Sequence, residues 1–451
     1  IVTGKEIRRA QPVRIEEVLR RVPGVVVRQS YAGGSRLDVS IRGVDGGRSR
    51  RVLILEDGIP ISLNPYSEPD LYHAPAVEWL RGVEVVKGSG NILFGPQTLA
   101  GTLNLLTTLP PDKPTARADL DVGTYGYTRA LASYGDALGD ARYVVQALHR
   151  SGDGFRVQPF SSTDGMMKVA IPTWKDGEAM IKLQVRRETA SSDDVGLTSA
   201  MWARDPRRPT LKPDDELVFE RYAASITHKQ RMDDDTKLTT LAYAYRTGRK
   251  WRRQDYTRSP VPGVAYERIA GDLGVQDGSL YFGSGNTVLD RTYDVMGVEP
   301  RLEHRFATDF VGHTVDVGGR VLYETADSAQ RAGTTTTTYG GASQYAEARG
   351  TTGMGAYIQD RIAFRPDLLV TPGIRLEHAR YARTILRQDL GSGPQDIDVR
   401  GTRDATGIIP GVGMIYGKKR AHVFGGLHAG YAPPRFTNAI NANGFASNVK
   451  G

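Results

Sequence analysis

The spacing of hydrophobic residues divides the chain into two regions. Before about residue 111 the apolar runs are short and mixed in type. The segment IEEVLRRVPGVVVRQ predicts a short helix that Pro23 and Gly24 end, and its apolar face consists of Ile15, Val18, Leu19 and Val22. The runs SRLDVSIRG, RRVLILEDGIPIS and VEWLRGVEVVKG indicate strands rich in Val, Ile and Leu, punctuated by Gly and Pro. Residues 1–111 are therefore predicted to form a small α+β domain.

From about residue 112 onward, a two-residue alternation replaces helical periodicity. Apolar or aromatic residues alternate with polar ones in three clear segments: Ile181, Leu183 and Val185 in EAMIKLQVRRE, Leu241, Tyr243 and Tyr245 in TKLTTLAYAYRTG, and Val315, Val317, Val321 and Tyr323 in HTVDVGGRVLYET. Each run has roughly the 9–11 residues of a tilted strand that crosses a bilayer. The pattern predicts a transmembrane antiparallel β-barrel over residues 112–451, with the apolar faces towards lipid and the polar faces towards a lumen.

A soluble β-sandwich also alternates, so the connections between the runs matter. Two of them are long and polar, TTTTTYGGASQYAEARGTT and RKWRRQDYTRSPVPGVAYERIAGDLG. Such lengths exceed sandwich turns and suit the extracellular loops of a membrane barrel.

Composition agrees with a barrel and excludes several other classes. The chain has 52 Gly and 21 Tyr, no Cys, and 59 Lys and Arg against 51 Asp and Glu. The lack of Cys excludes disulfides and thiolate sites. An apolar run of about 18 residues, which a transmembrane helix needs, is not found in the sequence.

The sequence contains none of the catalytic or metal-binding motifs that we considered. HExxH, GxSxG, GxxxxGK[ST] and a strand-linked GxGxxG are all absent, and the eight His residues show no ligand spacing. We therefore expect no catalytic residue, no protein-bound metal and no intrinsic cofactor. Two alternatives stay open: a membrane-embedded hydrolase barrel, whose Ser–His pair would form only in space, and a passive diffusion porin.

Linked passages of the N-terminal region resemble the TonB-dependent outer-membrane receptors. These are VLRRVPGVVV, then SIRGVDGGRSRRVLILEDGIPI, then VEWLRGVEVVKGSGNILFGPQTLAGTLNLLT. They match, in order, the family's helix ending in Pro-Gly, its IRG strand, its DG(I/V)P turn, its EVV(K/R)G strand and its aGxxN strand. The resemblance implies that residues 1–111 are a plug inside the lumen of a barrel in the bacterial outer membrane. It also implies three partners: TonB with its inner-membrane energising complex, outer-membrane lipid and lipopolysaccharide, and a solute. Nucleic acid is not expected as a partner.

Further passages resemble the ferric-citrate branch of that family. They are EDGIPISLNPYSEPDLYHAPAVEWL, YRTGRKW, NTVLDRTYDVMGVEPRLEH and LLVTPGIRLEH. The resemblance implies active import of ferric citrate or a similar small anionic ferric siderophore, with the iron carried as part of the ligand. Uptake of another siderophore or organic metal chelate is the alternative.

The same resemblance points to ligand-binding residues. Arg246 and Arg291 match the family's two barrel arginines, and Arg349 falls near a third in the following loop. On the plug, the ligand-facing positions are Ser30 and Tyr31 in one loop and Tyr66, Ser67 and Glu68 in another. Arginine suits this ligand because its planar fork binds carboxylates bidentately and stays charged.

The second plug loop departs from the family pattern. This chain has Glu68 and Asp70 where the family shows Gln. Carboxylates there would repel a polyanion unless arginines intervene, so a chelate of mixed charge also fits.

Other charged and aromatic residues have simpler interpretations. Arg42, Arg48, Arg50 and Arg51 are expected to hold the plug to the barrel wall. Arg249, Lys250, Arg252 and Arg253 are expected in a solvated loop, with lipopolysaccharide phosphates as the alternative contact. Tyr125, Tyr127, Tyr243, Tyr245 and Tyr431 are expected at the membrane interfaces.

The alternating region is shorter than the family's barrel requires. Barrels of this family have about 22 strands, and the sequence accounts for about two-thirds of them. Because an unclosed barrel leaves strand edges unsatisfied in lipid, we expect the sequence to be part of a longer chain, or a second polypeptide to complete the barrel.

Overall fold

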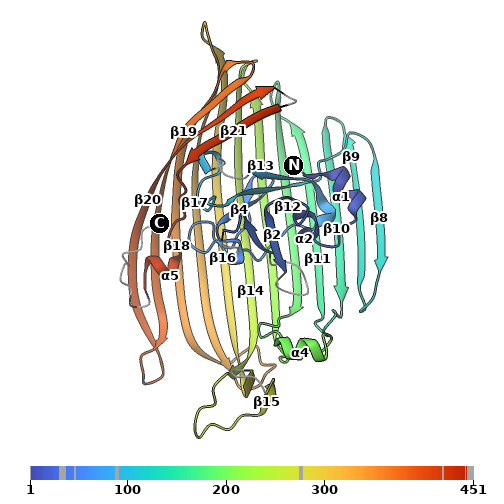
Figure 1. Ribbon diagram of the computed structural model, residues 1–451, viewed down its shortest axis with the longest axis vertical. Coiled ribbons are helices and arrows are strands. Elements are labelled where there is room, and N and C mark those ends of the chain that lie inside the picture. Colours follow the sequence, from blue (N-terminus) through green and yellow to red (C-terminus); the bar gives the residue numbers. More distant parts are fainter. Residues whose placement is uncertain are drawn as a thin grey trace.

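The computed structural model describes residues 2–29, 37–44, 47–86, 91–273, 278–418, 421–441 and 443. The N-terminal region is a compact set of short elements (Figure 1). They are β1 (Val2–Thr3), α1 (Gly4–Ala10), α2 (Ile15–Leu19), β2 (Val25–Gln29), β3 (Leu37–Ile41), η1 (Gly47–Ser49), β4 (Val52–Glu56), β5 (Ile59–Pro60), η2 (Val77–Trp79), β6 (Leu80–Val86), α3 (Asn91–Phe94) and β7 (Gly101–Thr107).

The N-terminal domain has its own hydrophobic core. Five strands form a mixed sheet in the order β1-β6-β7-β4-β5, and β2 pairs with β3. Ile54, Val83, Leu103 and Leu105 from the sheet pack with Leu19 of α2. The predicted helix exists but ends at Leu19, before Pro23, and the α+β prediction is confirmed.

A tight turn joins β4 to β5 and sets the direction of two acidic side chains. Asp57 and Gly58 have φ angles of 51° and 89°. Positive φ at both central residues is what a two-residue type I′ hairpin requires, and Asp-Gly is a favoured pair for it. The turn leaves Glu56 and Asp57 at the tip of the sheet, where they meet the second domain.

The second domain is one large antiparallel sheet. Its strands follow chain order from β8 to β21, except that β14 pairs directly with β16. The short strand β15 lies outside this order and pairs with β16. They are β8 (Thr115–Val122), β9 (Thr128–Leu138), β10 (Ala141–Gly152), β11 (Phe160–Pro172), β12 (Gly177–Ser191), β13 (Glu216–Arg231), β14 (Thr236–Thr257), β15 (Arg268–Gly271), β16 (Ser279–Ala307), β17 (Gly312–Gly333), β18 (Ala342–Arg365), β19 (Leu368–Asp389), β20 (Pro394–Lys418) and β21 (Ala421–His428). Two short helices, α4 (Ser199–Arg204) and α5 (Phe436–Ala439), are the remaining elements of the described residues.

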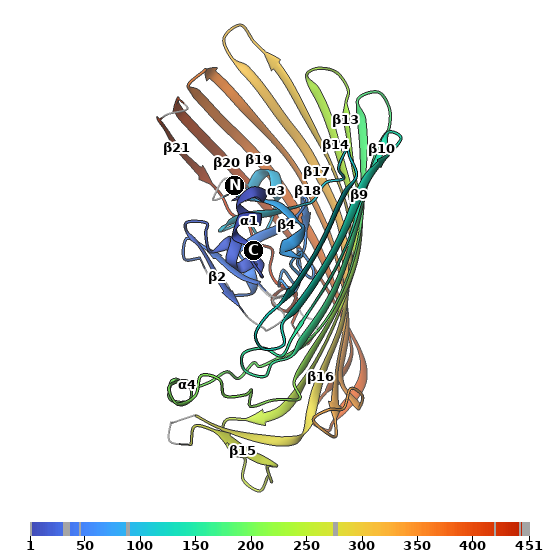
Figure 2. The ribbon, with the colours of Figure 1, turned by 90° about the vertical axis from the view of Figure 1, so that its right-hand side faces the viewer.

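The sheet curves around the N-terminal domain, which lies on its concave side (Figure 2). Strands β8 and β21 are its two edges, so the described residues form an open, strongly curved wall. The plug-and-barrel architecture predicted from the sequence is confirmed. β7 ends at Thr107 and β8 begins at Thr115, and the predicted domain boundary at residue 111 lies between them.

The two rims of the wall have different connections. At one rim lie the long ones, including 192–215 with α4 and 258–278 with β15 (Figure 1). At the other rim the turns are short, for example 173–176 and 308–311. In outer-membrane barrels the long connections are extracellular and the short turns periplasmic. Among the described residues, no helix is long and apolar enough to cross a membrane.

The predicted alternation is confirmed in two of the three segments and reversed in the third. Leu183 and Val185 of β12 and Val321 and Tyr323 of β17 are exposed on the outer face. In β14, however, the aromatic face is the inner one: Leu241, Tyr243 and Tyr245 are buried, and Ala242, Ala244 and Arg246 point outward. The reversal arises because the plug, itself a protein surface, supplies an apolar partner inside the lumen.

Candidate functional site

A hairpin of the plug, residues 64–70, reaches into the barrel wall, and we call it the plug finger. The backbones of Asn64 and Glu68 exchange two hydrogen bonds of 3.1 and 3.0 Å. The N–H of Leu63 donates to the carbonyl oxygen of Asp70 at 3.1 Å. These bonds make the finger a defined turn that carries its polar side chains at fixed positions.

Inward-facing carboxylates of the barrel hold the finger. The N–H groups of Tyr66 and Ser67 donate to Glu324 of β17 at 3.2 and 2.8 Å. The Tyr66 hydroxyl donates to Glu377 of β19 at 2.6 Å. Gly353 of β18 makes room for the Tyr66 ring, because a Cβ at that position would lie 2.5 Å from it. The tip of the finger is therefore seated in the wall.

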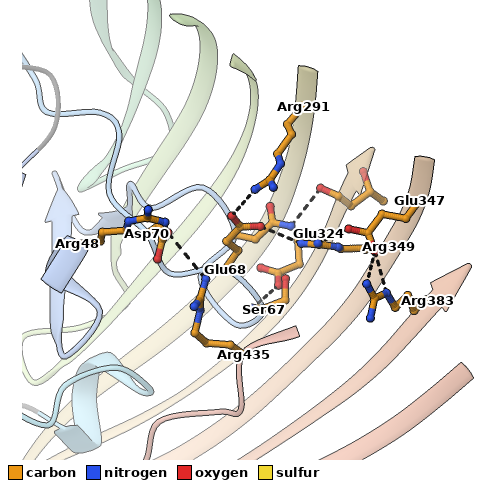
Figure 3. Close-up of polar contacts among 12 residues, drawn as sticks. Arg48, Ser67, Glu68, Asp70, Arg291, Glu324, Glu347, Arg349, Arg383 and Arg435 are labelled. Atoms are coloured by element: carbon orange, nitrogen blue, oxygen red, sulfur yellow. Dashed lines mark hydrogen bonds and ion pairs between the residues drawn. The ribbon is translucent and has the colours of Figure 1, made fainter. Parts of the chain in front are cut away.

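Glu68, which closes the turn of the finger opposite Asn64, lies between two barrel arginines (Figure 3). Its Oε1 is 3.2 Å from Nη1 of Arg291 on β16, and its Oε2 is 2.9 Å from Nη1 of Arg349 on β18. Arg349 also pairs with Glu347 of its own strand, and Glu347 in turn pairs with Arg383 of β19. Alternate strands thus bring together two arginines that are far apart in the sequence.

Asp70, at the base of the finger, is fully buried among cations. Arg48 and Arg50 of the plug contact its carboxylate at 2.8 and 2.6 Å, and Arg435 approaches it at 3.9 Å. Burial opposes ionisation, but the hydrogen bonds from Arg50 and Arg48 outweigh it and lower the pKa of Asp70. Arg48 and Arg50 therefore brace the plug internally, which corrects the expectation that they hold the plug to the barrel wall.

Cations outnumber carboxylates around the finger. The arginines are Arg48, Arg50, Arg249, Arg291, Arg349, Arg375, Arg383 and Arg435, and the carboxylates are Glu68, Asp70, Glu324, Glu347 and Glu377. Several of these arginines also have N–H groups that are not used in hydrogen bonds among the described residues. Within the described residues, the buried Nε atoms of Arg249, Arg291, Arg349 and Arg435 have no hydrogen-bond partner. A surplus of positive charge with unused N–H groups is a suitable environment for an anion.

The chain after β21 turns into the lumen and covers the finger. Phe436 donates its N–H to the Ser67 carbonyl at 2.9 Å and is almost completely buried. Its ring lies 4.8 Å from the Arg349 guanidinium carbon and packs edge-on against Tyr381. Arg383 donates to the Ile440 carbonyl at 2.7 Å. Residues 431–440 thus form one wall of the site, and nothing in their local sequence pattern predicted it.

A second group of charges joins the plug to the wall near the short-turn rim. Lys182 of β12 lies 2.6 Å from Glu56 and 2.7 Å from Asp57, and Lys168 of β11 lies 3.0 Å from Asp57. Burial would raise the pKa of Glu56, but Lys182 outweighs it and lowers that pKa. His73 stands 3.3 Å from Glu56, and burial lowers its pKa to about 4. We call Glu56, Asp57, His73, Lys168 and Lys182 the plug anchor.

The predicted site residues fall into three groups. Tyr66, Ser67, Glu68, Arg291 and Arg349 meet at the finger, and Arg349 lies on strand β18, not in a loop. Ser30 and Tyr31 lie outside the described residues. Arg246 points away from the lumen: its side chain is 64% exposed and forms hydrogen bonds of 2.7 and 2.9 Å with Asp294 on the outer face. The expectation that Arg246 lines the lumen is therefore wrong: its neighbours Tyr245 and Thr247 face inward, and Arg246 faces outward.

Two further expectations need correction. Arg249 lies inside β14, faces inward and stacks over the Tyr72 ring at 4.6 Å, so this part of the basic run is not a solvated loop. Tyr243, Tyr245 and Tyr431 are buried at the lumen side and not exposed at the membrane interface. Glu324, Glu377 and Arg383 also belong to the site, but the sequence did not identify them as site residues. Their position on the polar side of the two-residue alternation was the only feature of the sequence that indicated an inward orientation.

In the part of the chain that the structure describes, no group of three His, Asp or Glu side chains is placed to hold a metal ion.

Comparisons with known proteins agree with the fold. A family described as "TonB-dependent Receptor Plug Domain" matches residues 1–102, and one described as "TonB dependent receptor-like, beta-barrel" matches residues 183–450, more than half of the chain.

Solved structures of receptors share the fold at low identity. The ferric citrate transporter FecA, in its unliganded form, superposes with a TM-score of 0.78 at 21% identity, over 97% of this chain and 62% of that one. The ferric yersiniabactin uptake receptor FyuA from Yersinia pestis gives 0.72 at 15% identity, over 94% and 63%.

A curated relative matches over a shorter length. The vitamin B12 transporter BtuB of Photobacterium profundum is 32% identical over 172 residues, which is 37% of this chain and 27% of that protein. This chain spans less than two-thirds of the length of each of these relatives. The plug, the curved barrel wall and the two family matches together establish that the chain belongs to the TonB-dependent receptor family, whose members are receptors of the bacterial outer membrane and not enzymes.

Proposed function

We propose that the chain forms the plug and part of the barrel of a transporter that imports a small anionic iron chelate, with ferric citrate as the first candidate. The observation that supports this is the surplus of arginines around the plug finger, several of which have a buried Nε with no partner among the described residues. Ferric citrate complexes present free carboxylates, which arginine forks bind through paired hydrogen bonds. In this proposal the iron is cargo, and the protein contacts the citrate groups.

Transport requires energy from the inner membrane, which we propose TonB supplies. The plug is held in the wall by the finger and by the plug anchor, in which Lys182 is buried against Glu56 and Asp57. Breaking buried ion pairs leaves uncompensated charges and costs several kcal/mol. Thermal motion alone therefore opens the lumen only rarely, and a pull on the plug would make opening frequent.

A corrinoid is the second candidate, because the relative from Photobacterium profundum is named a vitamin B12 transporter. The two candidates differ in charge. Ferric citrate complexes are polyanions, whereas cyanocobalamin carries little net charge. Only the anion benefits from the surplus of arginines at the finger.

Binding measurements on the full-length receptor test the proposal. We expect ferric citrate to bind, and Arg291→Ala to weaken its binding by about tenfold to hundredfold, since a hydrogen bond to a charged group is worth roughly 1.5–3 kcal/mol. Arg291→Lys should restore part of that loss, because an ammonium lacks the planar fork. Arg246→Ala is the matched control: it removes an arginine from the outer face and should leave the affinity unchanged.

Two results would contradict the proposal. Binding of cyanocobalamin, but not of ferric citrate, would assign the receptor to the second candidate. Equal affinity of wild type and Arg291→Ala for ferric citrate would show that the finger arginines are not the site.

A further inference from the structure

Glu68 of the plug finger lies between two arginines of the barrel wall. It is a carboxylate that is 4% exposed, with one oxygen on Arg291 and the other on Arg349. The two arginines come from β16 and β18, so only the intervening strand β17 separates them in the wall. Figure 3 shows both guanidinium groups directed at this one side chain.

The fit of Glu68 to the two arginines is incomplete. Each guanidinium reaches it through a single Nη1 atom, while the buried Nε of each has no partner among the described residues. A free carboxylate that can choose its orientation can engage Nη and Nε of one guanidinium together, and such a bidentate pair is the stronger arrangement. The two arginines therefore hold Glu68 with part of their donor capacity unused.

We propose that Glu68 is a built-in occupant of a carboxylate-binding site, and that a carboxylate of the transported chelate enters by displacing it. This inference rests on the proposed function and adds a restriction on the ligand. An occupant tethered in the same molecule acts at an effective concentration in the millimolar range or above. A monocarboxylate has only one group that can replace Glu68 on the arginines, so it does not displace Glu68. A chelate with two or more free carboxylates can bind Arg291 and Arg349 separately, and it therefore displaces Glu68.

Displacement of Glu68 would also loosen the plug finger. Glu68 is one of the side chains that attach the finger to the wall, beside the bonds of Tyr66 and Ser67 to Glu324 and of Tyr66 to Glu377. Its exchange for a ligand leaves the finger attached by the remaining contacts alone. Ligand binding and release of the finger from the wall are thus coupled through one carboxylate.

Small carboxylates test the site without any iron chelate. Glu68→Ala vacates the position, so sodium acetate should raise the unfolding temperature of this variant saturably at millimolar concentrations, through preferential binding to the folded state. Sodium chloride at equal ionic strength should not, and wild type should not respond to acetate. Asp294→Ala is the matched control, because it removes a carboxylate that pairs with an arginine on the outer face of the wall.

A second variant covers the case in which the alanine substitution disturbs folding. Glu68→Gln keeps the shape of the side chain and removes its charge. Ferric citrate should bind Glu68→Gln about tenfold or more tightly than wild type, since the competitor no longer holds two charge-assisted bonds. Citrate without iron should likewise stabilise Glu68→Gln more than wild type.

The outcomes separate this inference from the proposed function. An acetate response confined to Glu68→Ala supports the built-in occupant even if ferric citrate binds no variant. Ferric citrate binding to wild type, with no acetate response in Glu68→Ala and no tightening in Glu68→Gln, would overturn the inference and leave the proposed function standing. Weaker binding by Glu68→Gln would also overturn it, because Glu68 would then be a ligand contact.

Discussion

At the scale of single residues, the plug anchor shows how burial and charge oppose each other. Glu56 and Lys182 are both buried, so each costs desolvation, which their ion pair and the contact of Lys182 with Asp57 offset. His73 contacts Glu56 yet remains neutral near pH 7, because burial lowers its pKa to about 4. Burial therefore keeps His73 neutral, whereas the ion pair with Lys182 keeps Glu56 charged.

His73 predicts a specific pH dependence of stability. Its pKa is near 6.5 when unfolded and about 4 when folded, so its contribution is complete above about pH 6.5 and is lost as the pH falls through 4. The unfolding temperature of the receptor should fall over this window, by the equivalent of up to about 3 kcal/mol. His73→Gln should remove most of this slope and leave the losses below pH 4, where Asp57 and Asp70, whose pKa values are lowered, protonate. An identical slope in His73→Gln would show that another group titrates.

At the scale of elements, the inner face of the wall pairs tyrosines with glycines. Tyr243 of β14 lies opposite Gly297 of β16, and Tyr357 of β18 lies opposite Gly318 of β17. A Cβ at either glycine would come within 2.6 Å of the ring. The Tyr66 ring of the plug uses Gly353 of β18 in the same way. Glycine in these strands gives up packing of its own to admit an aromatic side chain.

Gly353→Ala should unseat the plug finger. The added methyl group would lie 2.5 Å from the Tyr66 ring, and overpacking of this kind costs typically about 1–3 kcal/mol. We expect faster proteolysis of the plug in the folded receptor and weaker ligand binding. Gly319→Ala in β17 is the control, because its nearest non-adjacent atom would be 3.5 Å away. Equal protease resistance of the two variants would refute the seating of Tyr66 against Gly353.

At the scale of the whole molecule, the plug is a domain with its own core, and it lies on the concave side of the barrel wall. Its core is made of its own residues. It meets the wall through mixed clusters of apolar side chains as well as through ion pairs. Removing the plug should therefore leave a barrel that still inserts. The inner face of that barrel would then be open to water.

Deletion of residues 1–110 from the full-length receptor should abolish the energy-dependent import that we propose for it and leave a leaky pore. We expect loss of saturable uptake, entry of large antibiotics that the intact receptor excludes, and no further effect of dissipating the inner-membrane energy. Intact receptor in cells without TonB should show neither uptake nor leak. Saturable, energy-dependent uptake by the deletion variant would contradict the role assigned to the plug.

The sequence determined the two-domain architecture because that information is local. Alternation in HTVDVGGRVLYET gives the strand and its two faces, with no need for distant residues. The resemblance placed Glu68, Arg291 and Arg349 near the ligand position, and the structure brings these three side chains together. It also named Arg246, which is one residue out of phase with the inner face.

Only the tertiary structure decided which face of β14 is inside and what the charges do. Apolar residues normally mark the lipid side of a barrel strand, but Tyr243 and Tyr245 face the plug, because a buried plug offers protein contacts where a porin offers water. Likewise, the sequence placed the carboxylate of Glu68 in a site expected to bind an anion. The structure shows that this carboxylate forms ion pairs with Arg291 and Arg349. Those partners are more than 200 positions away along the chain, so their contact is set by strand order and register, which no local pattern contains.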